Sequence, residues 1–263
     1  MKKILIILPL IILSLISGCG GDTKDDTAEL KKITIGIDEF APMGFHDEKL
    51  NVVGFDTDLA KEAARRMGVE VRFKPIDWNS KEYEITSGNV DMIWNGCDIM
   101  DEYKAYMIFS EPYMDNRQIL LVKAGNPQDI QSVADLAGKV VGTQAGSNSE
   151  IYIEQNKALR DSFAAFRTYP AINTGFDFLD GGEVDVLIID EIAARYEMSK
   201  HPERFTLIDE TVGPVTEFGI GFNKENTALR NKVQKVFDDM VADGTARKIS
   251  EQWFGTDLIK TRR

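Results

Sequence analysis

Three aspartates stand at or just after the ends of predicted β-strands, where a carboxylate can meet a ligand. Asp38 and Asp190 each close a predicted strand, and Asp98 follows a buried strand that stops at the turn Asn95-Gly96. Open α/β folds commonly hold ligands at such strand ends, and a buried carboxylate requires a cation as its partner. Two of the three also have an ordinary structural interpretation, Asp190 as the cap of a helix that begins at Glu191 and Asp38 as a turn residue.

The stretch Gly146-Ser147-Asn148-Ser149 opens a predicted helix and is suited to an anion. Its backbone N–H groups have no partner inside the helix, and its hydroxyls can donate as well. The same residue types are common helix N-caps. The stretch therefore marks either a carboxylate-binding site or an ordinary helix start.

The predicted elements that position these residues alternate between strand and helix. A strand over 32–38, a helix from Asp56 to its stop at Gly68 and a strand over 69–73 make a βαβ unit, for which a parallel strand pair is expected. The pattern starts again after Val122, which predicts a second α/β lobe. Further strands are predicted at 90–94, 139–143, 165–169, 184–190 and 218–222, and further helices at 80–86, 173–179, 191–199 and 229–241.

The N-terminus has the pattern of an exported lipoprotein. Two lysines precede an apolar run over 4–16 that is too short to span a bilayer as a helix, so residues 1–18 are predicted to be a signal peptide. The sequence Ile-Ser-Gly-Cys that ends at Cys19 is typical of a lipobox and predicts a lipid anchor, with an ordinary signal peptide as the alternative. Residues 19–32 are rich in charge and glycine and are predicted to form a flexible tether.

The composition excludes several classes of function. The formal net charge is -12, and it becomes -14 when the two lysines of residues 1–18 are removed, which argues against nucleic acid as a partner. After lipidation of Cys19 only Cys97 is left, so neither an internal disulfide nor a Cys-x-x-Cys metal site is expected. With only His46 and His201 available, a zinc site or a histidine-based triad is poorly supported, and no cofactor is predicted.

Short motifs occur along the chain in a fixed order, namely Gly54-Phe55-Asp56, Trp94-Asn95-Gly96, Phe109–Tyr113, Val184-Asp185, Asp190 and Trp253-Phe254-Gly255. This ordered set resembles the polar amino-acid solute-binding proteins of ABC importers. The resemblance covers about 33–257 and implies a type II periplasmic-binding-protein fold, an α/β clamp with two crossing hinge strands. It implies one lobe from 33–122 and 218–263 and a second lobe from 123–217.

The resemblance also implies a ligand site between the lobes. Asp190 matches the family's ammonium-binding aspartate, Asp38 its strand-end aspartate, and Trp78 and Phe40 the aromatic rings that enclose the ligand, although such rings are often core residues. The predicted ligand-binding residues are Asp38, Phe40, Trp78, Gly96, Asp98, Tyr103, Gly146, Ser147, Asn148, Ser149 and Asp190.

Two positions depart from the family's pattern. Tyr103 replaces the arginine that grips the ligand's carboxylate, and a tyrosine offers one neutral hydrogen bond in place of a charge. Asp98 replaces a hydroxyl. Both changes move the predicted pocket towards cations, with Arg117 either a compensating group or a solvent-facing residue. Cys97 is predicted to be a small buried filler.

These observations predict a monomeric lipoprotein outside the cytoplasm, anchored to the cell membrane, that captures a small amino-acid-like or amine solute and presents it to an ABC permease. The alternative is an enzyme, because dehydratases of arogenate-type substrates share this fold, and Glu102 or Asp98 would then be the general acid. The predicted anchor favours capture over biosynthesis.

Overall fold

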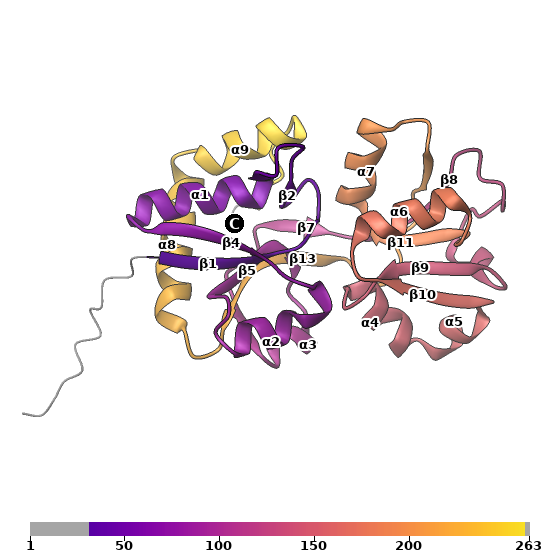
Figure 1. Cartoon of the computed structure of the whole chain (residues 1–263), viewed down its shortest axis with the longest axis horizontal. Helices are drawn as coiled ribbons and strands as arrows, with labels where there is room; N and C mark the ends of the chain where they lie inside the picture. The colour runs from indigo at the N-terminus through magenta and orange to yellow at the C-terminus, as the bar shows by residue number, and fades with distance from the viewer. Residues whose placement is uncertain (1–31, 261–263) are drawn as a thin grey trace, which may run out of the picture. The chain divides into compact units, whose positions relative to one another are not determined.

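The computed structural model describes residues 32–260, which lie within one compact unit. Two β-sheets carry most of the architecture, each with helices on both faces (Figure 1). The predicted signal peptide, Cys19 and the predicted tether up to residue 31 lie outside the described residues.

The first sheet has the strand order β4-β1-β5-β13-β6, with β7 paired to β13. β1 pairs in parallel with both β4 and β5, as expected for the predicted βαβ unit, whereas β13 runs antiparallel to β5, β6 and β7. Its strands are β1 (Lys32–Ile37), β4 (Glu70–Pro75), β5 (Met92–Asp98), β6 (Met107–Phe109), β7 (Met114–Asn116) and β13 (Thr216–Asn223).

The second sheet has the order β10-β9-β11-β8-β12. β8 is antiparallel to both β11 and β12, so residues 118–122, which the predicted boundary assigned to the first lobe, pair within the second sheet. The chain crosses between the sheets at Arg117 and again over 209–215. The strands are β8 (Gln118–Lys123), β9 (Val140–Gln144), β10 (Ala165–Tyr169), β11 (Val186–Asp190) and β12 (Phe205–Ile208).

The helices cover both sheets. Figure 1 shows α1 and α9 on one face of the first sheet and α2 and α3 on the other, with α6 and α7 opposite α4 and α5 around the second sheet. A hairpin of β2 (Phe45–His46) and β3 (Val52–Val53) and two 3-10 turns, η1 (Trp78–Ser80) and η2 (Val133–Leu136), complete the described elements. The helices are α1 (Phe55–Met67), α2 (Lys81–Thr86), α3 (Asp101–Lys104), α4 (Asn148–Gln155), α5 (Lys157–Ser162), α6 (Ile172–Gly181), α7 (Glu191–Lys200), α8 (Thr227–Ala242) and α9 (Thr245–Phe254).

The predicted strand end at Asn95-Gly96 is wrong, because β5 continues to Asp98. Gly96 has φ 60°, and the pairing of β5 with β13 shifts register between Gly219 and Gly221. Such an irregularity is a β-bulge, which a glycine at positive φ accommodates. The strand continues through the bulge and ends at Asp98.

Candidate functional site

Eight of the predicted ligand-binding residues line one small pocket between the two sheets, with a cavity volume of about 20 Å³. The ends of β1, β5 and β11 contribute a carboxylate each, η1 contributes an aromatic ring, and the start of α4 contributes hydroxyl and amide groups. The lining residues are Asp38, Phe40, Trp78, Gly96, Asp98, Ser147, Asn148 and Asp190.

Asp98 and Asp190 share one amide group. Nδ2 of Asn116 donates to Oδ1 of Asp98 at 3.0 Å and to Oδ1 of Asp190 at 2.6 Å. Asp98 also accepts from the Thr216 hydroxyl at 2.5 Å and from Nδ2 of Asn148 at 2.7 Å. Burial raises the pKa of both carboxyls, and the charge of Asp190 raises the pKa of Asp98 further. A cation between them would relieve both effects.

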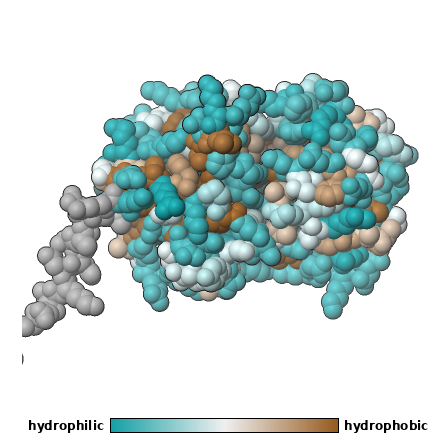
Figure 2. Space-filling view, in the orientation of Figure 1, coloured by the Kyte–Doolittle hydropathy of each residue, from teal (hydrophilic) through white to brown (hydrophobic). Residues whose placement is uncertain are grey.

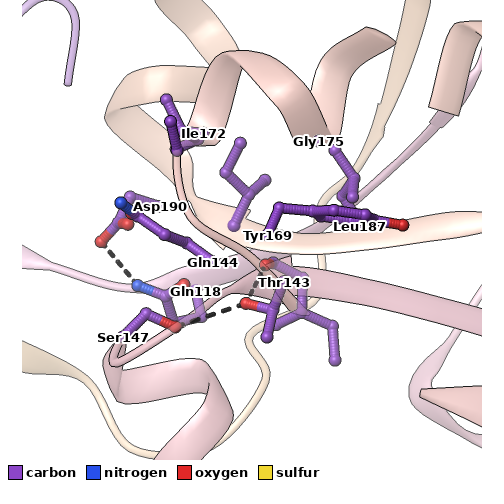
Figure 3. A pocket seen from close by; sticks show the side chains of 12 residues that line it. Gln118, Thr143, Gln144, Ser147, Tyr169, Ile172, Gly175, Leu187 and Asp190 are labelled. Carbon is purple, nitrogen blue, oxygen red and sulfur yellow. Dashed lines mark hydrogen bonds between the residues drawn. The ribbon is translucent and has the colours of Figure 1, made fainter. Parts of the chain in front are cut away.

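The interpretation of Asp190 as a helix cap is wrong. The residue stands at the N-cap position of α7, but its side chain makes no capping hydrogen bond. It instead accepts from Nε2 of Gln118 at 2.6 Å, and Gln118 in turn accepts from the Ser149 hydroxyl at 2.5 Å. Figure 3 shows the Asp190 and Gln118 side chains facing each other beside Ser147, in an adjoining pocket of the second sheet.

Asp38 adds a third carboxylate. It accepts a hydrogen bond from the backbone N–H of Glu39 at 2.7 Å and another from the Gln144 side chain at the end of β9. Burial is the largest influence on this group and raises its pKa to about 6. Because Gln144 belongs to the second sheet, this contact joins the two lobes.

Gly96 shapes the side of the pocket where β5 lies against the ring of Phe40. Its backbone N–H donates to Asp56 at 2.6 Å, and the Tyr113 hydroxyl donates to the same oxygen at 2.8 Å, which fixes the bulge. A Cβ at position 96 would collide with the ring of Phe40. Glycine is therefore needed both for the positive φ and for the close approach of that ring.

Three predicted site residues do not line the pocket. The Tyr103 hydroxyl donates to the carbonyl oxygen of Gly146 at 2.7 Å, so both residues are engaged with each other across the lobes. Ser149 is buried behind Gln118. Tyr103 therefore contacts the protein backbone. Its neutral hydroxyl donates to a carbonyl oxygen, whereas the charged guanidinium of an arginine would favour an anion.

Two residues considered from the sequence lie elsewhere. Arg117 pairs with Glu191 at 2.5 Å and with Asp209 at 2.6 Å, so its guanidinium is not directed at the pocket. Glu102 is exposed and accepts from Gln155 at 2.7 Å, and it does not line the pocket. Cys97 is buried, as predicted, and burial raises the pKa of its thiol. Trp94 is buried as well.

Sequence reasoning missed five residues that hold the site together. Asn116 and Gln118 are two positions apart in an extended segment and so share a face, a signal that was available. Lys81 follows Trp78 by three residues, a spacing that brings both to one side of a helical turn. Gln144 and Thr216 gave no signal, because their partners Asp38 and Asp98 are more than 100 positions away in the sequence. The missed residues are Lys81, Asn116, Gln118, Gln144 and Thr216.

Figure 2 shows a largely hydrophilic surface on the visible face. Among residues 32–260, no helix is long and apolar enough to cross a membrane. Over the same residues no cluster of three histidine, cysteine or carboxylate side chains could hold a metal ion, so the three pocket aspartates do not form such a cluster.

Comparison with known proteins identifies the family. A family model of bacterial extracellular solute-binding proteins, family 3, matches residues 33–256. The L-cystine-binding protein TcyJ of Escherichia coli is 30% identical over 254 residues, covering 94% of each chain. The arginine-binding extracellular protein ArtP of Bacillus subtilis is 28% identical and covers 97% of this chain and 98% of its own.

A solved structure agrees in fold. The substrate-binding protein of an ABC uptake transporter from Streptococcus pneumoniae, with bound histidine, superimposes with a TM-score of 0.83 at 34% identity, covering 88% of this chain and 95% of its own. The alternative of a dehydratase is not supported, since the matching family consists of solute-binding proteins. The chain belongs to the bacterial extracellular solute-binding proteins of family 3, and it is a two-lobed binding protein rather than an enzyme.

Proposed function

We propose that this protein captures an amino acid with a cationic or polar side chain and delivers it to an ABC permease. The observation that carries the proposal is the convergence of Asp38, Asp98 and Asp190 on one pocket, beside the ring of Trp78. Carboxylates with raised pKa values favour a ligand that brings positive charge. The relatives that bind cystine, arginine or histidine are consistent with a ligand that carries an ammonium group.

The ligand would act by joining the lobes. Asp38 and Asp98 come from the first sheet, whereas Asp190 and the start of α4 come from the second. A solute that contacts both sets favours the closed form, which the permease would recognise. We further propose that the protein acts as a monomer outside the cytoplasm, anchored to the cell membrane through Cys19.

A second candidate ligand is an amine without a carboxylate. The observation in its favour is that the residues lining the pocket include no arginine, so no guanidinium is available for a carboxylate there. The helix start at Ser147 would then face neutral groups of the ligand.

Calorimetry with a panel of solutes tests the proposal. Arginine, histidine, cystine, glutamine and putrescine represent the favoured classes, and glutamate and aspartate the disfavoured one, because a dicarboxylate would add negative charge to three aspartates. Asp190→Asn should weaken the best ligand by about a hundredfold or more, as expected when one partner of a buried charge pair is lost. Asp98→Thr should weaken it less, and Asp161→Asn, at an exposed aspartate of α5, serves as the matched control. Tight binding of glutamate alone would contradict the proposal.

A further inference from the structure

Lys81, at the start of α2, has a buried ammonium group at the boundary between the lobes. The residue is 3% exposed, and Nζ donates to the carbonyl oxygen of Gly146 at 2.7 Å and to that of Trp78 at 3.2 Å. It lies 4.4 Å from the ring centroid of Tyr103 and 5.1 Å from that of Trp78. Ring faces and carbonyl oxygens both attract a cation without neutralising it.

The charge of this ammonium has no close counterion. Within the part of the chain that the structure describes, no carboxylate lies within 4.0 Å of Nζ. The groups that act on it from farther away are Cys97, Glu150, Asp98 and Asp77. The thiol is neutral, because burial raises its pKa. Burial also lowers the pKa of Lys81, to about 8. Keeping this buried ammonium charged therefore costs free energy, and an anion beside Nζ would offset that cost.

One donor of Nζ remains for such an anion. A lysine ammonium has three donors, and two are engaged with carbonyl oxygens. Gly146 directly precedes Ser147, the N-cap of α4, so the ammonium lies beside the N-terminus of that helix. The first N–H groups of a helix carry partial positive charge, and here they stand next to a full one. Trp78 and Ser147 both line the ligand pocket.

We propose that Lys81 is a ligand-binding residue and holds the carboxylate of the captured amino acid, together with the N-terminus of α4. The assignment rests on the proposed function, since it concerns a group of that same ligand. It gives the pocket one end for a carboxylate, at Lys81, and another for ammonium groups, at the aspartates. The ligand is then a complete amino acid rather than its decarboxylated amine.

Calorimetry on matched ligand pairs tests the assignment. Each pair differs only in the presence of carboxylate: arginine and agmatine, histidine and histamine, cystine and cystamine. Lys81→Met removes the ammonium and keeps an unbranched side chain. It should weaken binding of the amino acid in the pair that the wild type binds best by about ten- to a hundredfold more than binding of its amine, because the amine loses only the hydrogen bond of Nζ to the Gly146 carbonyl oxygen across the lobes. Lys81→Arg keeps the charge and should restore most of the preference for the amino acid.

Tyr103→Phe is the matched control, because the Tyr103 hydroxyl donates to the same Gly146 carbonyl oxygen but carries no charge. Tyr103→Phe should lower the affinity for the amino acid and for its amine by the same factor. If Lys81→Met also weakens both equally, or changes neither, Lys81 does not bind the carboxylate and the assignment is overturned alone. Wild-type protein that binds none of the six compounds, and neither glutamine nor putrescine, would instead overturn the proposed function and this assignment with it.

Discussion

The hydroxyl of Tyr103 donates to the carbonyl oxygen of Gly146 at 2.7 Å, and this hydrogen bond joins the two lobes directly. Tyr103 is 3% exposed, so the bond is shielded from water. The Tyr103 side chain is therefore engaged with the backbone of the second lobe.

Tyr103→Phe should therefore lower the affinity for every ligand that requires closed lobes. A neutral hydrogen bond contributes about 0.5–1.5 kcal/mol, which corresponds to roughly a 2- to 13-fold loss. Calorimetry on the wild type and the variant measures the difference. A loss confined to ligands with a carboxylate would contradict a closure role.

Affinity should depend on pH in two steps of opposite sign. Burial raises the pKa of Asp38 to about 6, and the pKa values of Asp98 and Asp190 are raised as well. A cation binds the ionised carboxylates, so affinity should rise from about pH 5 to pH 7, and binding at about pH 6 should release protons to the buffer. Above about pH 8 the Lys81 ammonium loses its proton, and amino acids should bind more weakly while their amines do not.

Titrations in two buffers of different ionisation enthalpy measure the proton release. Equal heats in both buffers at pH 6, with an affinity that is constant from pH 5 to pH 7, would show that the pocket carboxylates are already ionised in the free protein and would refute the first step.

Asp98→Asn should stabilise the free protein at neutral pH while weakening ligand binding. The pKa of Asp98 is raised, so the group's contribution to stability is complete at low pH and is lost as the pH rises through the folded-state value. The amide removes this loss, and the buried Oδ1 of Asn148, which has no hydrogen-bond partner among the described residues, can accept from it.

The expected gain at pH 7 is about 1–2 kcal/mol in the free energy of unfolding, or about 2–8 °C in Tm. Scanning calorimetry at pH 4 and pH 7 provides the comparison, with little difference expected at pH 4. A variant less stable than the wild type at pH 7 would mean that the hydrogen bonds of the carboxylate outweigh its desolvation.

If Cys19 carries a lipid anchor, removing this cysteine should change where the protein is found but not its ligand affinity. Cys19→Ala should move the protein from the membrane fraction to the surrounding soluble fraction, because a lipidated cysteine is the proposed attachment. Ligand affinity should stay the same, since the pocket lies within residues 38–190. Identical fractionation of the two forms would refute the anchor.

The sequence predicted those parts of the site that depend on local pattern. Asp38 and Asp190 were found because an apolar strand followed by a carboxylate is visible in the residue order. The extent of β5 was missed because Asn95-Gly96 is typical of a turn, whereas pairing with β13 carries the strand through a bulge to Asp98.

Contacts between the lobes could not be predicted in the same way. Lys81 meets Gly146 only because α2 of the first lobe docks against the start of α4 in the second. The role of Gln144 likewise depends on the closeness of β9 to Asp38. Neither contact can be predicted from local hydrophobic spacing, because each joins segments more than 60 residues apart.

Native mass spectrometry of freshly purified protein tests the central claim most directly. A protein that captures an amino acid at three carboxylates and a buried lysine should retain its ligand through a mild purification. The account predicts a bound mass that matches an amino acid with a cationic or polar side chain and that is absent from Asp190→Asn. A dicarboxylic acid recovered from the wild type, or the same bound mass in both proteins, would contradict it.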